Sequence, residues 1–292
     1  MTPPAVHLVE VGPRDGLQSE ERVVPTAIKV AFVDALSATG LEEIEVSSFV
    51  SPRWVPQLAD ASEVFSAIQR RPGTRYSALV PNEQGLERAL AARVDKIAVF
   101  TAASETFSRR NTNASIAESL ARLAPVVQRS PKPVRGYVST AFHCPYEGPI
   151  APGRVLEVAE RLVELGCTEL SIGDTIGRAT PSDVVALLEP LLQRAPVDRV
   201  AMHFHDTFGL ALENVRAAAA LGITRFDGSA GGIGGCPYAP GAPGNIATQA
   251  LVAAFPGRTG VDGELVERAA ALVRPYLGRK PLPVESHEQG LS

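Results

Sequence analysis

The stretch Val6-His7-Leu8-Val9-Glu10-Val11-Gly12-Pro13-Arg14-Asp15-Gly16 separates the two folds that this chain could adopt. Its first six residues form a short run of β type, and the next five form a turn that contains glycine and proline. A doubly wound open sheet would be expected to carry a Gly-x-Gly-x-x-Gly turn after its first strand. The turn at Gly12–Gly16 has a different pattern, which favours the competing architecture, a closed barrel.

The rest of the chain supports the barrel, because further β-type runs alternate with helical patterns. These runs lie near Leu41–Val46, Arg75–Val80, Val94–Phe100, Val134–Ser139, Glu169–Gly173, Arg199–His203 and Ile223–Asp227. The clearest helix is predicted at Arg154–Leu165, with Gly166 as its C-terminal stop, and Thr180 is the expected N-cap of the next helix. Together with the first strand, these runs predict an α/β fold, a (β/α)8 TIM barrel.

The chain shows no repeat period and no low-complexity linker, which predicts a single domain over residues 1–292. The barrel is expected at about 5–256, and a C-terminal helix and tail at about 261–292 form a short helical extension.

The overall composition is that of an ordinary globular protein, with 292 residues, 45% hydrophobic and 21% charged. The formal net charge is -4 without a basic run, which argues against nucleic acid as a partner. No apolar stretch approaches the roughly 20 residues of a membrane span, and the N-terminus lacks a signal or transit pattern. Three cysteines, an odd number, indicate free thiols in a reducing compartment, so we expect a cytoplasmic protein.

The segment His203-Phe204-His205-Asp206 ends the seventh predicted strand. Because side chains alternate along a strand, His203 and His205 share one face. Two imidazoles there can bind one divalent metal, or one can pack while the other caps a backbone carbonyl. Barrel enzymes of this type carry their chemistry at the C-terminal ends of the strands, so the polar residues at the other strand ends test the metal interpretation.

Two oxygen ligands are available at the same predicted face. Asp15 follows the first strand, and Asn245 ends a glycine-rich loop after the eighth. With His203 and His205 they form a set of two nitrogens and two oxygens, which suits Mn²⁺ or Mg²⁺, with Zn²⁺, Co²⁺ or Fe²⁺ as competitors. Asp15 could instead be a turn residue and Asn245 a helix cap. Four such residues at one face favour the metal site.

Arg14 would lie beside this metal, where its fixed donors suit an enolate or carboxylate oxygen. It could also form an ion pair with Glu45, and both interpretations can hold together. We expect Glu45 to position other groups rather than to act as a base. Asp174 could be a base, could orient another group, or could cap the turn before Thr175. Further candidates for substrate contacts are Gln18, Ser48, Thr140 and Ser171.

The tripeptide Cys-Pro-Tyr occurs twice, at Cys144 and at Cys236. Cys236 follows a glycine-rich segment, whose backbone can move and can approach a ligand closely. Cys144 follows His143 near the fifth strand and could be a buried hydrophobe. Cys167 starts a strand and is expected to be structural.

Several motifs resemble those of the 3-hydroxy-3-methylglutaryl-CoA lyase family. The similarity runs in register from about Val6 to Val252, and the motifs that carry it are Val9–Gln18, Ser48–Pro52, Gly173–Gly177, His203–Asp206 and Gly234–Ala239. The family belongs to the metal-dependent lyases and condensing enzymes built on this barrel.

The resemblance implies a role for each matching residue. Asp15, His203, His205 and Asn245 match the metal ligands, and Arg14 matches the arginine that stabilises the enolate. The family's active-site acids and its loop cysteine match Glu45, Asp174 and Cys236. His203 is also counted among the catalytic residues, and Arg14 among those that bind substrate.

The implied reaction is retro-Claisen cleavage of (S)-3-hydroxy-3-methylglutaryl-CoA to acetyl-CoA and acetoacetate, with Mg²⁺ or Mn²⁺ as cofactor. A base removes the hydroxyl proton, the carbon–carbon bond breaks, and a general acid, Cys236, protonates the acetyl carbanion. The expected partner is the acyl-CoA substrate, and a homo-oligomer, a dimer or larger, is expected.

The chain departs from the family pattern at two positions. Gln249 stands where many members have Glu, and His143 stands where members have small or apolar residues. Two other functions stay open on this sequence. One is a related lyase for another branched 3-hydroxyacyl-CoA, such as citramalyl-CoA, or the condensation direction. The other is a non-catalytic metal-binding barrel, against which the presence of Arg14 and Cys236 argues.

Overall fold

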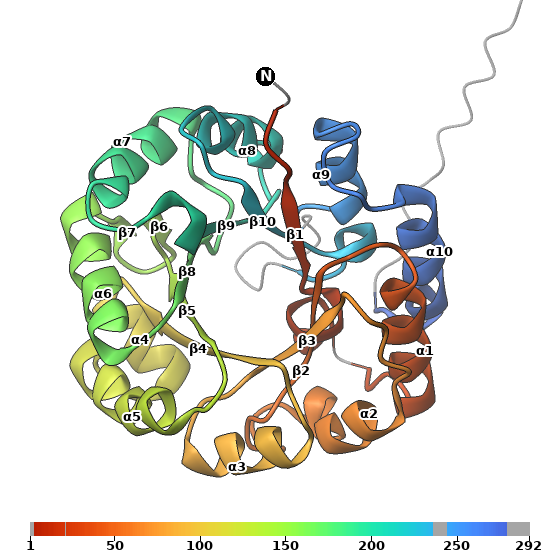
Figure 1. Ribbon diagram of the computed structural model, residues 1–292. Helices are drawn as coiled ribbons and strands as arrows, with labels where there is room; N and C mark the ends of the chain where they lie inside the picture. The colour runs from red at the N-terminus through yellow and green to blue at the C-terminus, as the bar shows by residue number, and fades with distance from the viewer. Residues whose placement is uncertain (1–2, 21, 236–243, 279–292) are drawn as a thin grey trace, which may run out of the picture.

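Within residues 3–20, 22–235 and 244–278, which the computed structural model describes, eight parallel strands close into a barrel. Figure 1 looks along the barrel axis and shows the strands inside a ring of helices. Around the barrel the strands follow the order β1-β10-β9-β8-β5-β4-β3-β2, so that β1 and β2 close the ring. This arrangement confirms the predicted (β/α)8 TIM barrel.

The barrel strands overlap all the predicted β-type runs, with ends that differ by at most two residues. Their bounds are β1 His7–Glu10, β2 Glu43–Ser48, β3 Arg75–Leu79, β4 Lys96–Ala102, β5 Val134–Ser139, β8 Glu169–Asp174, β9 Val200–Phe204 and β10 Arg225–Gly228. A short antiparallel pair, β6 His143–Cys144 and β7 Gly148–Pro149, follows β5 outside the barrel. Local patterning locates these strands well because both faces of each are buried.

The helices of the ring cover the outer face of the barrel. Their bounds are α1 Thr26–Ser37, α2 Ala61–Ala67, α3 Glu83–Ala91, α4 Glu105–Thr112, α5 Ile116–Arg129, α6 Pro152–Leu165, α7 Pro181–Leu192, α8 Ala211–Ala220, α9 Thr248–Ala254 and α10 Gly263–Val273. Gly166 ends α6 with φ +112°, and the Thr180 hydroxyl caps α7 in a capping box with Asp183, as the sequence predicts.

The C-terminal extension is present as α10, which lies beside α1 in Figure 1. Asp262 caps the helix through the backbone N–H groups of Glu264 and Leu265, and its own N–H donates to the carbonyl of Thr39. None of the helices in the described part of the chain combines the length and apolar character that a membrane span needs.

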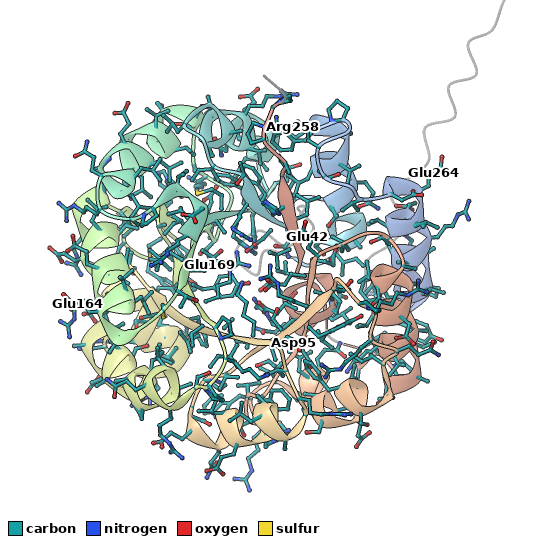
Figure 2. The ribbon with its side chains drawn as sticks, in the orientation of Figure 1. Glu42, Asp95, Glu164, Glu169, Arg258 and Glu264 are labelled. Atoms are coloured by element: carbon teal, nitrogen blue, oxygen red, sulfur yellow. The ribbon has the colours of Figure 1, made fainter. Side chains whose placement is uncertain are left out.

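The inside of the barrel holds charged side chains in addition to apolar ones. The ammonium of Lys96 lies 3.0 Å from Glu43 and 3.0 Å from Glu169, which is labelled in Figure 2. Arg135 contacts Glu169 at 3.1 Å and Asp227 at 2.5 Å. The N–H at Nε of Arg135 is not aimed at Glu169, so that contact is an ion pair without a hydrogen bond. These buried charges are paired with one another, which offsets the loss of hydration.

Candidate active site

The turn after β1, whose sequence favours a barrel, also positions the first residues of the site. Directly after β1, residues Gly12–Gly16 form one π-helical turn, in which the carbonyl of Val11 accepts from the backbone N–H of Gly16 at 3.1 Å and also from that of Asp15 at 2.7 Å. Gly16 is needed because a Cβ there would lie 2.9 Å from the carbonyl oxygen of Ile233. The turn sets Arg14 and Asp15 side by side at the C-terminal end of the barrel, with Nη1 of Arg14 donating to Oδ1 of Asp15 at 2.6 Å.

The predicted nitrogen and oxygen ligands come together at this end. One ligating atom from each of Asp15, His203 and His205 lies within 4.8 Å of the others. Asn245 joins them because its backbone bridges to that of His205, and its Nδ2 lies 2.9 Å from Oδ2 of Asp15. The amide nitrogen of Asn245, rather than its oxygen, therefore faces Asp15. Of the four predicted ligands, three form a compact donor set and the fourth lies next to it.

This donor set fits a divalent cation. Nδ1 of His205 is buried and has no hydrogen-bond partner among the described residues, and such an orphaned nitrogen is unusual in a protein interior. Imidazole nitrogens suit Zn²⁺, Fe²⁺ and other later transition metals, and the carboxylate oxygen suits Mg²⁺ and Mn²⁺, so this set of two nitrogens and one oxygen can accept a cation of either class. Asp15, His203 and His205 could therefore hold a metal ion.

The protonation states of two of these residues, Asp15 and His205, also suit a metal, whereas, against the effect of burial, Asp227 and Asp15 raise the pKa of His203. Burial opposes the charge of Asp15, but attraction to the guanidinium of Arg14, and after it to His203, outweighs burial and holds the pKa of Asp15 well below the usual range. Burial and the neighbouring His203 lower the pKa of His205 to about 4, so its imidazole is neutral at pH 7. An ionised carboxylate and a neutral imidazole are the forms that bind metals.

Arg14 is held from a second side by Glu45. Nε of Arg14 donates to one oxygen of Glu45, and the Tyr137 hydroxyl donates to the other at 2.7 Å. The guanidinium also lies over the Tyr137 ring, 5.4 Å from its centroid. The ion pair between Arg14 and Glu45 that the sequence predicts is therefore present, and Glu45 has both oxygens occupied.

The other predicted acid, Asp174, lies at the end of β8 and is fully buried. Its carboxylate accepts from the backbone N–H groups of Arg178 at 3.1 Å and Ala179 at 3.0 Å. Burial raises the pKa of Asp174 to about 6 in spite of these hydrogen bonds. The sequence allowed a cap of the turn before Thr175, and the carboxylate instead caps the turn that follows Thr175. The roles of Asp174 as a base or as an orienting group stay predictions.

Of the candidates for substrate contacts, Gln18 follows β1, Ser48 ends β2, Thr140 follows β5 and Ser171 lies within β8. Gln18 is exposed. The hydroxyls of the other three donate within the protein: Ser48 to the carbonyl of Leu79, Thr140 to that of Ser139, and Ser171 to Asp227.

Of the three cysteines, Cys236 lies outside the described residues. Cys144 is buried, with its sulfur 3.0 Å from the hydroxyl of Ser104. Cys167 is also buried, and burial raises the pKa of its thiol to about 12. The structural interpretation of Cys167 agrees with this environment.

Gln249 and His143, the two residues that depart from the family pattern, lie in different environments. The side chain of Gln249 accepts from the N–H of Gly231 at 3.0 Å and donates to Glu267 of α10 at 2.7 Å, which ties the loop after β10 to that helix. His143 lies on β6, with Nδ1 buried and unpartnered within the described residues.

Sequence reasoning missed three residues of this region: Arg135, Tyr137 and Asp227. Asp227 lies opposite His203 in the register of β10 and β9, and its Oδ2 is 3.2 Å from Nδ1 of His203. A charged residue within a run that otherwise predicts a buried strand was the available signal, and it applies to both Arg135 and Asp227. Tyr137 carried no comparable signal, because tyrosine is common in strands.

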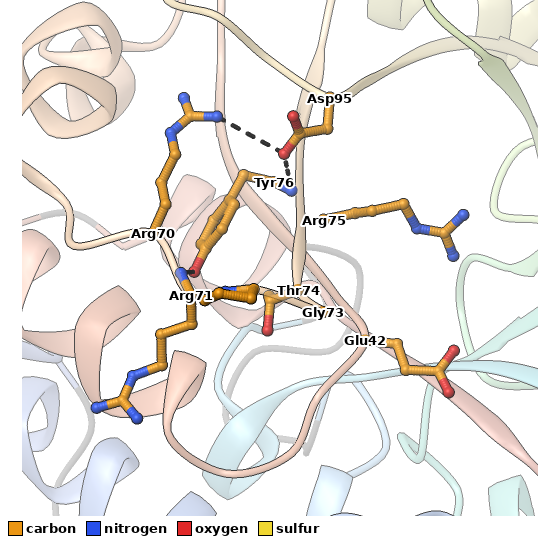
Figure 3. Close-up of a pocket in the computed structure, with 9 residues that line it drawn as sticks. Glu42, Arg70, Arg71, Gly73, Thr74, Arg75, Tyr76 and Asp95 are labelled. Carbon is orange, nitrogen blue, oxygen red and sulfur yellow. Dashed lines mark hydrogen bonds and ion pairs between the residues drawn. The ribbon is translucent and has the colours of Figure 1, made fainter.

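A separate hollow of about 830 Å³ lies at the opposite end of the barrel (Figure 3). It is lined around the N-terminal ends of β2, β3 and β4, where Asp95 pairs with Arg70 at 3.6 Å and accepts from the backbone N–H of Tyr76 at 2.9 Å. Because barrel enzymes of this type react at the C-terminal ends of their strands, this hollow is not the candidate active site.

Comparison with known proteins gives consistent matches over most of the chain. Residues 5–271 match the family described as HMGL-like. The cytoplasmic 3-hydroxy-3-methylglutaryl-CoA lyase of Rattus norvegicus is 50% identical over 277 residues, which are 93% of this chain and 81% of that protein. The 3-hydroxy-3-isohexenylglutaryl-CoA/hydroxy-methylglutaryl-CoA lyase of Pseudomonas aeruginosa is 48% identical over 95% of this chain and 94% of its own. The crystal structure of the HMG-CoA lyase from Brucella melitensis aligns with a TM-score of 0.91 and 49% identity, over 93% of this chain and 98% of that one.

Proposed function

This chain belongs to the HMGL-like family, and we propose that it is a carbon–carbon lyase that cleaves (S)-3-hydroxy-3-methylglutaryl-CoA to acetyl-CoA and acetoacetate. The observation that carries the proposal is the cluster of Asp15, His203 and His205 beside Arg14, at the end of the barrel where such enzymes react. The names and the identities of the rat and Pseudomonas aeruginosa relatives support the same substrate.

Asp15, His203 and His205, with Asn245 next to them, are the residues that would hold Mg²⁺ or Mn²⁺. When bound, the cation supplies Lewis-acid polarisation of hydroxyl and carboxylate oxygens of the substrate. The ionised Asp15 and the neutral His205 are ready for that ligation without a proton having to leave.

The reaction breaks the bond between the hydroxyl-bearing carbon and the methylene next to the thioester. The hydroxyl proton goes to a base, the hydroxyl-bearing carbon becomes the ketone of acetoacetate, and the bonding electrons form the enolate of acetyl-CoA. Arg14 stabilises that enolate oxygen, because Glu45 and Asp15 hold its guanidinium in a fixed position. A preorganised donor of this kind is typically worth about 10²–10³ in rate. Protonation of the methylene carbon completes acetyl-CoA, and Cys236 is the proposed acid.

We assign positioning roles to the two predicted acids. Glu45 holds Arg14 in place, since both of its oxygens are bonded. Asp174 holds the turn after β8 through two backbone N–H groups. Gln18, Ser48, Thr140 and Ser171 remain proposed substrate contacts.

A second candidate is a related lyase for another branched 3-hydroxyacyl-CoA, because the Pseudomonas aeruginosa relative is named for two such substrates. The proposed partner is in either case an acyl-CoA thioester. We also propose a homo-oligomer, a dimer or larger, and a cytoplasmic location, which the name of the rat relative supports.

The proposed function is tested with purified protein, (S)-3-hydroxy-3-methylglutaryl-CoA and Mg²⁺ or Mn²⁺. We expect acetyl-CoA and acetoacetate in equal amounts. Citramalyl-CoA and the isohexenyl analogue are assayed in parallel. Turnover of one of these two thioesters without turnover of (S)-3-hydroxy-3-methylglutaryl-CoA would support the second candidate. Absence of acetyl-CoA from every thioester, with metal bound, would show that the barrel is not a lyase of this class.

A further inference from the structure

Arg135 of β5 is the largest of the fully buried side chains in the described part of the barrel, with 1% of its surface exposed. Its Nη2 donates to Oδ1 of Asp227 at 2.5 Å, and its Nε lies 3.1 Å from Glu169. A cation buried so deeply is costly unless its partners are well placed, and apolar residues of similar volume often serve stability equally well. Arg135 lies between two groups of site residues, and this position suggests a role other than stability.

The first group connects Arg135 to the predicted metal ligands. Asp227 binds Arg135 through Oδ1, and through Oδ2 it accepts from Ser171 at 3.0 Å and lies 3.2 Å from Nδ1 of His203. A carboxylate at Nδ1 fixes that nitrogen as the N–H donor and leaves Nε2 free for a metal. Nε2 of His203 lies on the side of Asp15, at 4.0 Å from its Oδ2.

Among the described residues, no carboxylate is hydrogen-bonded to His205 as Asp227 is to His203. Nδ1 of His205 is buried without a hydrogen-bond partner in the described chain, whereas Nδ1 of His203 is bonded to Asp227. The two imidazoles are close, with ring centroids 5.3 Å apart, and in the described part of the chain a carboxylate orients His203 but not His205. Asp227 and Arg135 therefore act on one ligand of the pair.

The second group connects Arg135 to the enolate-binding side. Arg135 and Tyr137 are two positions apart on β5 and share its inner face, and the guanidinium lies 4.9 Å from the centroid of the Tyr137 ring. Arg14 lies over the same ring, at 5.4 Å. Tyr137 then donates to Glu45, the carboxylate that holds Nε of Arg14. The ring also meets His203 edge-on, with centroids 6.3 Å apart and planes at 86°.

We propose that Arg135 is a positioning residue that aligns both halves of the site, His203 through Asp227 and Arg14 through Tyr137. It touches neither of them directly, so it is not a catalytic residue. The catalytic half of this inference, the connection from Arg135 to Arg14, rests on the proposed function. The metal half, the connection from Arg135 to His203, concerns cation binding alone.

Four variants test the two connections, the first two separately and the last two together. Asp227→Asn keeps the shape but removes the charge, and we expect the Kd of Mn²⁺, measured by electron paramagnetic resonance on metal-stripped protein without substrate, to rise about 10- to 100-fold. Tyr137→Phe keeps the ring but loses the hydrogen bond to Glu45. It should lower kcat roughly 10- to 100-fold at saturating Mn²⁺ and leave the Kd of Mn²⁺ within twofold of wild type. Arg135→Met should show both defects, and Arg135→Lys should recover part of each.

The matched control is Lys96→Met, because Lys96 is also a buried cation and shares Glu169 with Arg135, but its ion pairs, with Glu43 and Glu169, include neither Asp227 nor Tyr137. It should lower the melting temperature and leave the Kd of Mn²⁺ and the kcat within threefold of wild type. If Arg135→Met folds and behaves like Lys96→Met, Arg135 is merely structural and the proposal is wrong.

If Arg135→Met does not fold, Asp227→Asn and Tyr137→Phe decide. A Kd of Mn²⁺ in Asp227→Asn within twofold of wild type, or a kcat of Tyr137→Phe within threefold, would overturn the corresponding connection. If the wild type binds Mn²⁺ and Asp227→Asn weakens this binding, but the wild type cleaves no thioester, the proposed function is contradicted and the metal half of the proposal is supported. An active wild type without these effects would contradict the positioning role alone.

Discussion

The hydroxyl of Tyr137 donates to Oε2 of Glu45 at 2.7 Å, a contact between the inner faces of β5 and β2. The remaining oxygen of Glu45 accepts from Nε of Arg14, so the carboxylate has no oxygen left that is free of a bond. A carboxylate bonded in this way orients its partners and is poorly placed to remove a proton from a substrate. This contact makes Arg14, and not Glu45, the group to test for the chemistry.

Arg14→Lys should retain metal and substrate but lose about 10²–10³ in kcat. Lysine presents a single ammonium and cannot bond to Glu45 and Asp15 in the fixed plane of a guanidinium. The measurement is steady-state kinetics together with Mn²⁺ titration. Arg75→Lys, at the opposite end of the barrel, is the control and should keep near-normal turnover. Near-normal kcat in Arg14→Lys would remove Arg14 from the chemistry.

Removal of divalent metal with a chelator should abolish turnover, and Mg²⁺ or Mn²⁺ should restore it. His203→Ala removes one member of the donor set and should weaken metal binding, measured by calorimetry. Phe204→Leu on the same strand points to the opposite face and is buried against Phe142, so it should cost about 1–2 kcal/mol of stability and leave metal binding unchanged. Full activity in metal-free protein would refute the metal assignment.

A thiol-alkylating reagent should inactivate the protein by modifying Cys236, and substrate should slow the reaction. Cys144 and Cys167 are buried, at 2% and 5% exposure, and should react slowly in the native state. Cys236→Ala should lose most of its turnover while binding metal and acyl-CoA, and Cys144→Ala should remain largely active. Peptide mapping identifies the modified residue. If Cys144→Ala is the inactive variant, the acid must be sought near β5.

Glu10 should make the protein less stable as the pH rises. Its carboxylate accepts from the N–H groups of Gly12 and Ala230 and from the Thr248 hydroxyl, yet burial dominates and raises its pKa from 4.5 to about 7. The folded state therefore holds a proton that the unfolded state has released between about pH 4.5 and 7. The associated stabilisation, roughly 3 kcal/mol, is present below pH 4.5 and is lost as the pH passes 7.

The measurement for Glu10 is urea unfolding at several pH values from 5 to 8. Glu10→Gln cannot ionise; its Oε1 can accept from the N–H groups of Gly12 and Ala230, and its Nε2 can donate to the Thr248 hydroxyl, which reverses that bond. The stability of this variant relative to wild type should therefore increase with pH. Glu63→Gln, at an exposed position of α2, serves as the control and should follow the wild-type profile. Parallel profiles for Glu10→Gln and wild type would show that Glu10 does not titrate in this way.

Much of the candidate site was accessible from the sequence because its residues lie in short local patterns at strand ends. The spacing of His203 and His205 sets them on one face, and the turn after β1 sets Arg14 beside Asp15. For Asp174 the residues alone left three roles open. The structure shows its carboxylate on the backbone of the turn after β8, a contact that depends on the path of that turn.

The sequence by itself determined the barrel, its strands and the predicted metal ligands, since alternation, caps and turn residues act over a few positions of chain. Only the tertiary structure decided which side chains meet inside the barrel. Arg135 and Asp227 are 92 positions apart, as are Glu45 and Tyr137, and each pair forms because closure of the sheet brings its strands around one axis. No local pattern encodes such pairs, because a buried charge in a strand shows that a partner is needed but not where in the chain it lies.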